Sequence, residues 1–244
     1  MPGRAVLLVG ASSPIGRAIG RRFAADGDRV AGVSLEPLAE AEPAFAAHLA
    51  VDCSTSEGAD DAVSAAMDLL GGLNVVVLAA AVMPVAAAAD TTDEQWRGSL
   101  DTILSSAFYV ARPALPVMKP GSSLVAVTSV NATLAAPGLP AYAAAKAGVE
   151  GLVRQLALEY GPRGIRANAV APGMIGNAAL PKVTEGYPLR RVGTPSDVAE
   201  AVCFLASDAA SFITGCVLPV DGGLSISSPA AWIRPDLRAR FLCE

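Results

Sequence analysis

Residues 4–16 read RAVLLVGASSPIG, a short apolar run that leads directly into a turn containing glycine. The run Arg4–Val9 has the length and composition of a buried strand, and a helical pattern follows the turn. Gly10 would allow a tight turn, and Gly16 would allow close backbone approach. A glycine pair alone also fits an ordinary structural turn, but the strand before it and the helix after it favour a phosphate-binding turn. Pro14 removes one N–H donor, although proline is tolerated in the first turn of a helix.

The same alternation of strand and helix continues along the chain. Strands are predicted at Arg4–Val9, Arg29–Ser34, Leu49–Asp52, Val75–Ala79, Ser123–Ser129, Ile165–Val170 and Val217–Val220. Helices are predicted at Ile15–Asp26, Glu57–Leu70, Asp93–Val117, Ala141–Tyr160 and Ser196–Ser207, with Thr91 to Glu94 able to form a capping box. The strands do not alternate with polar residues, as expected when helices cover both faces of a sheet. The predicted fold is α/β, a doubly wound, Rossmann-like parallel sheet of about seven strands with helices on both faces.

Composition narrows the functional classes. The 244 residues contain no linker, repeat or charge block, so we expect one domain over residues 1–244, with residues 225–244 as a C-terminal tail. A net charge of −5 without a basic stripe argues against nucleic acid as a partner. The longest apolar stretch, Val75–Ala89, is shorter than the roughly 20 residues that cross a membrane, so no membrane partner is expected.

The cysteines and the histidine of the sequence exclude further classes of functional site. The cysteines show no Cys-x-x-Cys spacing and no secretory signal precedes them, which predicts reduced thiols and a cytoplasmic protein. They are Cys53, Cys203, Cys216 and Cys243. His48 is the single histidine, so no metal site is expected, and a Ser-His-Asp triad would have to use that residue. No Gly-x-Ser-x-Gly segment accompanies it.

Tyr142 and Lys146 lie one turn apart on a predicted helix, so their side chains share one face. A nearby ammonium favours the phenolate, so the pair could exchange protons below the ordinary phenol pKa of about 10. Ser129 ends the preceding strand, where it could donate a hydrogen bond to a substrate carbonyl. The spacing alone also fits a surface tyrosine and lysine on an ordinary helix.

Further motifs supply the context that this spacing lacks. In chain order they are Gly10–Gly16, Ser129, Tyr142-x-x-x-Lys146-Ala-Gly, Asn168-Ala-Val-Ala-Pro172-Gly173, Arg191-Val-Gly-Thr-Pro-Ser-Asp-Val-Ala and Val220-Asp221-Gly-Gly. Over roughly residues 4–224 the chain resembles the short-chain dehydrogenase/reductase family, in particular its 3-oxoacyl-carrier-protein-reductase-like members.

The resemblance implies an NAD(P)-dependent oxidoreductase that interconverts a ketone and a secondary alcohol on a small, apolar or cyclic substrate. Tyr142 would be the acid/base, Lys146 would bind the nicotinamide ribose and lower the pKa of Tyr142, and Ser129 would orient the carbonyl. Cofactor contacts are expected at Gly10, Ser12, Ser13, Ile15, Gly16, Ser34, Asp52, Cys53, Ala80, Tyr142, Lys146, Pro172, Gly173 and Ile175. A homo-oligomer, tetramer or dimer, would form on the helices that contain Trp96–Met118 and Tyr142–Tyr160.

Two departures from the family pattern concern the interior of the site. Val9 replaces the usual Thr, and Leu78–Ala81 replaces the usual Asn-Asn-Ala-Gly; we interpret this double change as a polar brace replaced by apolar packing. Ile103 stands where the family has a catalytic Asn that helps to hold a water of the proton relay. Thr102 and Ser106 are expected to point elsewhere on the helix. A non-redox enzyme of the same fold (dehydratase, isomerase or cyclase) and a cofactor-binding scaffold therefore remain as alternatives.

A third departure concerns the choice between NAD and NADP. Ser34 stands where NAD-preferring relatives carry Asp, whereas neither Ser13 nor Leu35 offers a basic group to a 2′-phosphate. Glu36 would oppose such a phosphate, so the sequence slightly favours NAD.

The last departure concerns the substrate side. The segment Met174–Arg190 is shorter than the usual family lid, and the chain continues about twenty residues beyond Gly223. We hypothesise that this tail, anchored by Trp232 and Phe241, covers a neighbouring subunit or its pocket in place of the lid. A frayed terminus is the alternative.

Overall fold

The sheet of this protein is parallel throughout, as the sequence predicts. The computed structural model describes residues 3–38 and 42–241, and its strands lie in the order β3-β2-β1-β4-β5-β6-β7. The strands are β1 (Ala5–Val9), β2 (Arg29–Ser34), β3 (Ala47–Ala50), β4 (Val75–Leu78), β5 (Ser123–Val127), β6 (Arg166–Pro172) and β7 (Val217–Val220). The strand order reverses between β1 and β4, where doubly wound sheets bind their ligands.

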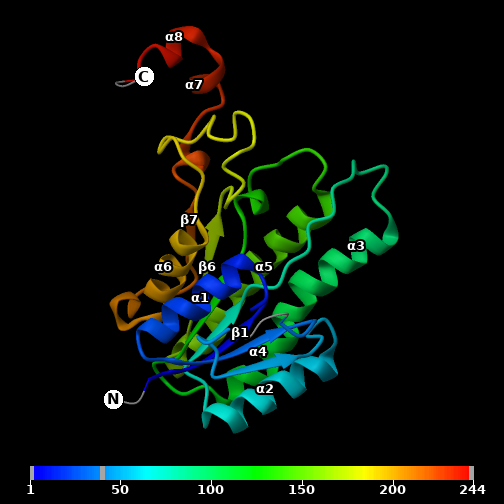
Figure 1. The fold of residues 1–244 in the computed structure, drawn as a ribbon, viewed down its shortest axis with the longest axis vertical. Coiled ribbons are helices and arrows are strands. Elements are labelled where there is room, and N and C mark those ends of the chain that lie inside the picture. Colours follow the sequence, from blue (N-terminus) through cyan, green and yellow to red (C-terminus); the bar gives the residue numbers. More distant parts are fainter. Residues whose placement is uncertain (1–2, 39–41, 242–244) are drawn as a thin grey trace.

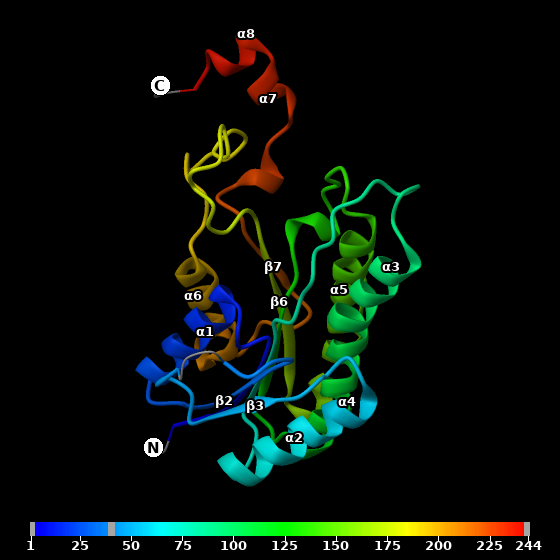
Figure 2. The same ribbon diagram turned by 45° about the vertical axis from the view of Figure 1, so that its right-hand side comes forward.

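Helices cover both faces of the sheet, which confirms the predicted fold class. One layer is formed by α1 (Pro14–Ala25) and α6 (Pro195–Ala206), and the other by α2 (Ser56–Leu70), α4 (Ser106–Val117) and α5 (Pro140–Tyr160) (Figure 2). The shorter helices are α3 (Asp93–Ser99), η1 (Leu100–Ser105), η2 (Val130–Ala132), η3 (Gly161–Arg163), η4 (Asp208–Ala210), η5 (Leu224–Ile226), α7 (Ala230–Ile233) and α8 (Pro235–Arg238). Among the described residues, none of these helices has the length and apolarity needed to cross a membrane.

The apolar strands explain the two cores. Every residue of β1, β4 and β5 is buried, and successive side chains point to opposite faces of the sheet. Leu7 and Val9 therefore pack with α2, α4 and α5, whereas Val6 and Leu8 pack with α1 and α6. Ser123, at the start of β5, is the single polar residue in these three strands.

The predicted helix Asp93–Val117 is divided into three parts. Between α3 and α4 the six residues of η1 form a π-helix, in which each hydrogen bond spans one residue more than in an α-helix. The first part, α3, begins at Asp93 as predicted, but its capping box joins Thr92 to Gln95 rather than Thr91 to Glu94. Helix α6 begins at Pro195, one residue before the predicted Ser196, and Thr194 caps it.

The turn after β1 lies between the ends of its two neighbouring strands. The N–H groups of Gly10 and Ala11 both donate to the carbonyl of Val33 at the end of β2 (2.9 and 3.0 Å). On the other side, a Cβ on Gly10 would lie 2.5 Å from the carbonyl carbon of Ala79, just beyond β4. Gly10 also has a φ of 90°, which side chains with a Cβ rarely adopt. The position therefore requires glycine.

Apolar side chains fill the space beside this turn. Val9 and Leu78 are partners in the register of β1 and β4, and both are buried. With Ile103, which is also buried, they line a gap of about 10 Å³. A gap of this size holds at most one water molecule.

We expect Gly10→Ala to lower the free energy of unfolding by about 3 kcal/mol or more, because the strained φ and the collision with Ala79 both contribute. Gly27→Ala is the matched control: Gly27 has a φ of 83°, but a Cβ there meets no atom within 4 Å. Its expected cost is about 1–2 kcal/mol. Urea unfolding of both variants measures the difference, and equal costs would show that the contact with β4 is not the constraint.

Candidate functional site

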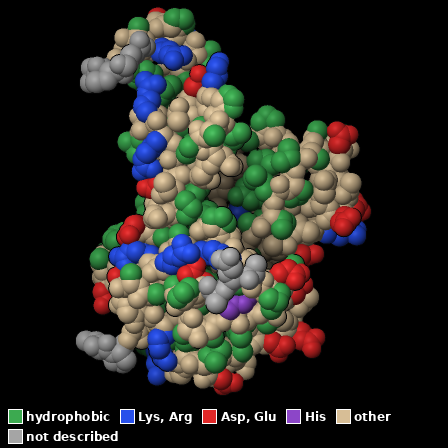
Figure 3. Space-filling model, viewed as in Figure 1, with side chains coloured by type: hydrophobic (Ala, Val, Ile, Leu, Met, Phe, Trp, Pro, Cys, Tyr) green, Lys and Arg blue, Asp and Glu red, His purple; other side chains and the backbone are tan. Residues whose placement is uncertain are grey.

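A cleft of about 710 Å³ opens at the carboxyl ends of the strands. Its walls come from the segments that follow β1, β2, β3, β4, β5 and β6, together with Tyr142 and Lys146 of α5. Hydrophobic side chains gather beside the hollow in the middle of the face shown in Figure 3. Both the turn after β1 and the pair Tyr142 and Lys146 line this one cleft.

The structure brings almost all of the predicted site residues together in this cleft. Those that line it are Gly10, Ser12, Ser13, Ile15, Ser34, Asp52, Cys53, Ala80, Ser129, Tyr142, Lys146, Pro172, Gly173 and Ile175. Gly16 does not line it. A Cβ on Gly16 would lie 2.2 Å from the carbonyl oxygen of Gly10, so this glycine allows α1 to pack against the end of β1.

The N-terminus of α1 retains some of its N–H donors. The Ser13 hydroxyl caps the helix by accepting a hydrogen bond from the N–H of Gly16 (2.9 Å). Within the described residues, no hydrogen bond occupies the N–H groups of Ser12 and Ile15, which belong to cleft-lining residues. Pro14 contributes no donor. The turn can therefore bind a phosphate group, with fewer donors than an uncapped turn would have.

Ser129, Tyr142 and Lys146 meet where β5 ends against α5. The Ser129 hydroxyl accepts a hydrogen bond from the N–H of Asn131 (3.1 Å), which fixes its side chain at the start of η2. The Lys146 ammonium is buried and donates to the carbonyl of Val127 (2.7 Å). Its nitrogen lies 5.6 Å from the centre of the Tyr142 ring.

Burial dominates the electrostatics of this group. Burial lowers the pKa of Lys146 to about 8, because the ammonium loses its hydration. Burial also raises the pKa of Tyr142, and a hydrogen bond with Ser129 opposes that rise in part. In the chain by itself the pKa of Tyr142 is thus raised rather than lowered as predicted, because loss of hydration outweighs the hydrogen bond with Ser129.

The π-helical segment η1 contains both cleft-lining and core side chains. Thr102 and Ser106 line the cleft and point elsewhere than residue 103, as expected. The Ser106 hydroxyl donates to the carbonyl of Thr102 (2.6 Å). Ile103 instead points into the core behind Lys146, where it lines the small gap described above.

The outer part of the cleft contains residues outside the predicted catalytic and cofactor contacts, several of them in the predicted lid segment Met174–Arg190. They are mostly apolar and include Met83, Leu139, Met174, Asn177, Tyr187 and Leu224. Tyr187 is buried, and its hydroxyl accepts a hydrogen bond from the N–H of Met174 (2.8 Å), so it holds the segment after β6 in place. Tyr187 lies in an irregular loop, and no periodic pattern marks it.

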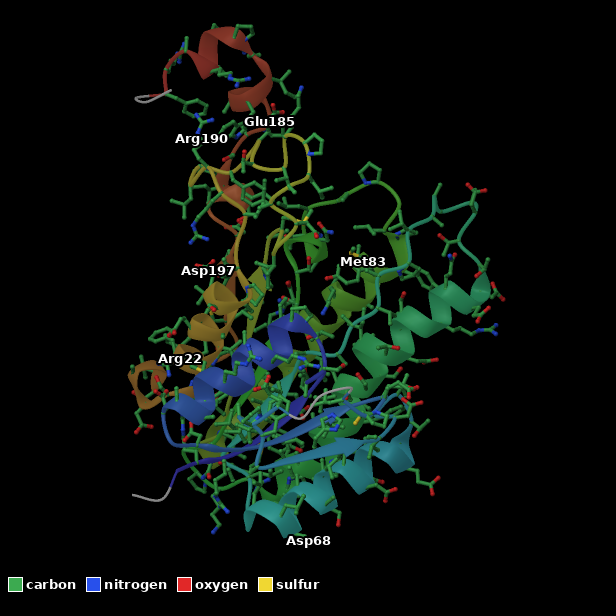
Figure 4. The ribbon with its side chains drawn as sticks, viewed as in Figure 1. Arg22, Asp68, Met83, Glu185, Arg190 and Asp197 are labelled. Atoms are coloured by element: carbon green, nitrogen blue, oxygen red, sulfur yellow. The ribbon has the colours of Figure 1, made fainter. Side chains whose placement is uncertain are left out.

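The C-terminal tail packs on this same loop. Arg190 of this loop lies beside the tail (Figure 4). Its guanidinium carbon is 5.0 and 5.2 Å from the ring centres of Trp232 and Phe241, which are 4.8 Å apart, so it packs over both rings. Trp232 and Phe241 thus contact the loop of their own chain, and the contact of the tail with a neighbouring subunit stays a prediction. The tail extends beyond the rest of the protein, at the end opposite the N-terminus (Figure 1).

The cysteines give no sign of a further site. Cys53 and Cys203 are buried free thiols, Cys216 is a partly buried free thiol, and Cys243 lies outside the described residues. Burial raises the pKa of Cys53 to about 11 and that of Cys203 to about 12. Over residues 3–38 and 42–241, no cluster of three or more His, Cys, Asp or Glu side chains could hold a metal ion.

Comparison with known proteins gives matches over most of the chain. A family model described as enoyl-(acyl carrier protein) reductase matches residues 10–225. An uncharacterized oxidoreductase of Schizosaccharomyces pombe is 36% identical over 241 residues, covering 93% of each chain. A 3-oxoacyl-[acyl-carrier-protein] reductase of Thermotoga maritima is 34% identical over 244 residues, covering 93% of this chain and 99% of the relative.

A solved structure gives the same result for the fold. Ligand-free aldohexose dehydrogenase of Thermoplasma acidophilum superimposes with a TM-score of 0.86 at 32% identity. The alignment covers 93% of this chain and 95% of that one. The similarity therefore includes both the sheet and the segments that form the cleft.

Lys146→Met should stabilise the protein at pH 7 by on the order of 2–3 kcal/mol, because it removes a buried charge. The pKa of Lys146 is about 8 in the folded chain, below the ordinary lysine value of 10.5, so the wild type carries this cost fully below pH 8. The advantage of the variant should shrink as the pH rises from 8 to about 10.5, because the folded wild type loses the charge there.

Urea unfolding at about pH 7 and pH 10 measures this advantage. Lys119→Met is the control, since Lys119 is exposed on the loop before β5 and should show no such change. An advantage of Lys146→Met that is constant with pH would contradict the buried-charge explanation.

Proposed function

We propose, from the premise that this chain belongs to the short-chain dehydrogenase/reductase family, that it interconverts a ketone and a secondary alcohol with Tyr142 as acid/base. The observation that carries the proposal is the position of Ser129, Tyr142 and Lys146 in the same cleft as a glycine turn with free N–H groups. Such a cleft can accept a dinucleotide at one place and a small carbonyl compound at another.

The residues of the cleft fit a nicotinamide dinucleotide. The N–H groups of Ser12 and Ile15 and the positive end of α1 suit its phosphates, and Gly10 keeps the turn free of a side chain. The name of one relative, an L-rhamnose 1-dehydrogenase of Azotobacter vinelandii, includes NAD(P)⁺. When bound, the cofactor would supply or accept the hydride, and the protein supplies the proton and the positioning.

The proton step falls to Tyr142. Its phenol is raised in pKa by burial, so it remains protonated at neutral pH and can donate to a developing alkoxide oxygen. Ser129 lies beside it and can donate a second hydrogen bond to the same oxygen. Lys146, held by the carbonyl of Val127, carries the positive charge that favours the phenolate left behind.

The outer cleft favours a small apolar or cyclic substrate. Met83, Leu139, Met174 and Leu224 present hydrocarbon and thioether surface to the space beyond Tyr142, and Asn131 adds one amide. Binding in such a pocket comes from burial of apolar area, and the few polar groups fix orientation. The aldohexose and acyl-carrier-protein substrates named for relatives belong to those proteins.

We also propose that the chain forms a homo-oligomer, tetramer or dimer, on the outer face of α4 and α5. Phe108 on α4 and Leu158 on α5 are 45% and 74% exposed, which leaves apolar surface on both helices. The cytoplasmic location is likewise a proposal and rests on the spacing of the cysteines.

Tyr142→Phe should lower the rate of carbonyl reduction on the order of 10²-fold or more, because the proton donor is lost. Binding of NADH or NADPH should be nearly unchanged. Tyr160→Phe, at the far end of the same helix, is the control and should keep the wild-type rate. The rates are followed at the nicotinamide absorbance with a panel of ketones, and near wild-type turnover by Tyr142→Phe would refute the assignment.

The apolar residue Ile103 favours a second candidate function, an enzyme of the same fold that catalyses no net redox reaction. Its apolar side chain fills the space behind Lys146, so no polar side chain at position 103 can refill the proton of the pair. A dehydratase, isomerase or cyclase on the same residues would convert its substrate without any change at the nicotinamide absorbance. A cofactor-binding scaffold would bind NADH or NADPH and convert none of the panel.

Removing the residues after Ser228 tests the tail. If the tail covers a neighbouring subunit, the truncated chain should elute at a smaller size in gel filtration and turn over more slowly. Arg190→Ala, which removes the group that packs over the two rings, should reproduce part of the effect. Unchanged assembly and activity in the truncated chain would end this hypothesis.

A further inference from the structure

We propose that Ser34 selects a dinucleotide whose adenosine ribose carries a free 2′-hydroxyl, because His48 holds the Ser34 oxygen as a hydrogen-bond acceptor. The inference rests on the proposed function, which puts a nicotinamide dinucleotide in the cleft. It names the form of that cofactor and assigns a positioning role to His48, the single histidine of the chain.

Ser34 is placed to contact the adenosine ribose. It is the last residue of β2, it lines the cleft, and it follows Val33, whose carbonyl binds the phosphate turn. In doubly wound sheets the residue at this place contacts the ribose 2′ position. Ser34 is 6% exposed, so its hydroxyl offers a small contact to the cleft.

The hydrogen bonds of Ser34 fix the direction of its proton. The hydroxyl lies 2.8 Å from the carbonyl oxygen of Glu36 and 2.7 Å from Nε2 of His48. A carbonyl oxygen can only accept, so the single hydroxyl proton must point toward Glu36. The contact with His48 is then a hydrogen bond only if Nε2 carries a proton and donates to Ser34. Both contacts are satisfied together in this arrangement and in no other.

The remaining lone pair of Ser34 is therefore an acceptor. A ribose 2′-hydroxyl can donate to it, whereas a 2′-phosphate presents acceptor oxygens and negative charge at neutral pH. Ser13 offers no spare proton either, because its hydroxyl donates to the carbonyl of Gly10 (3.0 Å) and accepts from Gly16. The adjacent Leu35 is exposed and apolar. Ser34 thus accepts the hydrogen bond of the ribose 2′-hydroxyl, as a carboxylate does in many NAD-binding proteins, but it carries no charge.

The surroundings of His48 keep it neutral near pH 7. Burial and the positive charge of Arg17 on α1 both lower its pKa, with burial the larger cause. The ring of Phe45 lies 6.4 Å away at 23° to the imidazole. Among the described residues, the segments beside His48 also carry Glu36 after β2 and Glu42 before β3, and Glu42 is paired with Arg21 of α1.

Arg17 is the group that opposes this selection. Its Nε donates to the carbonyl of Ser12 (3.3 Å), so its guanidinium lies beside the phosphate turn and could attract a 2′-phosphate. The proposal holds that the acceptor at Ser34 outweighs this cation. The experiment must therefore separate the two residues.

Dissociation constants of NADH and NADPH, measured by fluorescence titration at about pH 7.5, give that separation. The wild type should bind NADH about tenfold or more tightly than NADPH. His48→Gln keeps a side-chain N–H near the position of Nε2 and should retain the preference. His48→Phe removes the donor that fixes the orientation of the Ser34 hydroxyl, so its proton can leave the Glu36 carbonyl for a phosphate oxygen, and the two constants should come close together. Ser34→Ala should lose the preference by weakening NADH.

The pH dependence gives an independent readout, measured by calorimetry with NAD⁺ and NADP⁺ between about pH 8 and pH 5. Protonation of His48 adds a positive charge beside the 2′ position, so binding of NADP⁺ should strengthen relative to NAD⁺ as the pH falls. His48→Gln has no such titration, and its ratio should follow only the protonation of the 2′-phosphate itself.

Three outcomes would overturn the inference. Equal binding of both cofactors by the wild type refutes the selection while leaving the proposed function intact. Tighter binding of NADPH that disappears in Arg17→Gln assigns the 2′ position to Arg17 instead. Failure to bind either cofactor refutes the proposed function and the inference with it.

Discussion

The backbone of Gly10 lies so close to the end of β4 that no side chain fits between them, and the cleft depends on this contact. It fixes where α1 begins, because the turn is also tied to Val33 at the end of β2. The helix N-terminus is therefore aimed along the carboxyl edge of the sheet rather than away from it. The proposed binding of the dinucleotide depends on this direction of α1. It includes the N–H groups of Ser12 and Ile15 and the ribose contact at Ser34.

The second constraint is the burial of a lysine in an apolar wall. Lys146 has one backbone carbonyl as its hydrogen-bond partner, and Val9, Leu78 and Ile103 lie behind it. A buried charge of this kind lowers the stability of the folded chain. Titratable groups whose pKa is shifted by burial concentrate at functional sites, because the shifted pKa serves the chemistry. The apolar neighbours make the ammonium sensitive to any charge that enters the cleft, including the phenolate of Tyr142.

The sequence was sufficient to predict the alternating strands and helices and the residues that follow each strand. Buried parallel strands need continuous apolar runs, and the residues after them must meet at one edge, so Ser129, Asp52 and Pro172 were predicted to converge. The π-helical turn at η1 was missed because no periodic pattern marks one additional residue in a helix. Tyr187 and the Ser34–His48 contact were missed for a different reason. They join residues through irregular segments whose paths depend on packing, and local patterns carry no information about them.

The packing of Arg190 over Trp232 and Phe241 has a consequence for how this protein can diversify. The outer wall of the cleft and the chain terminus share one attachment, yet neither belongs to the sheet or to the group around Tyr142. Substitutions in these two segments can reshape the entrance to the cleft while the hydride and proton geometry stays constant. A new substrate range could then arise through paired substitutions about 40 to 50 residues apart in the sequence, one on each side of this contact.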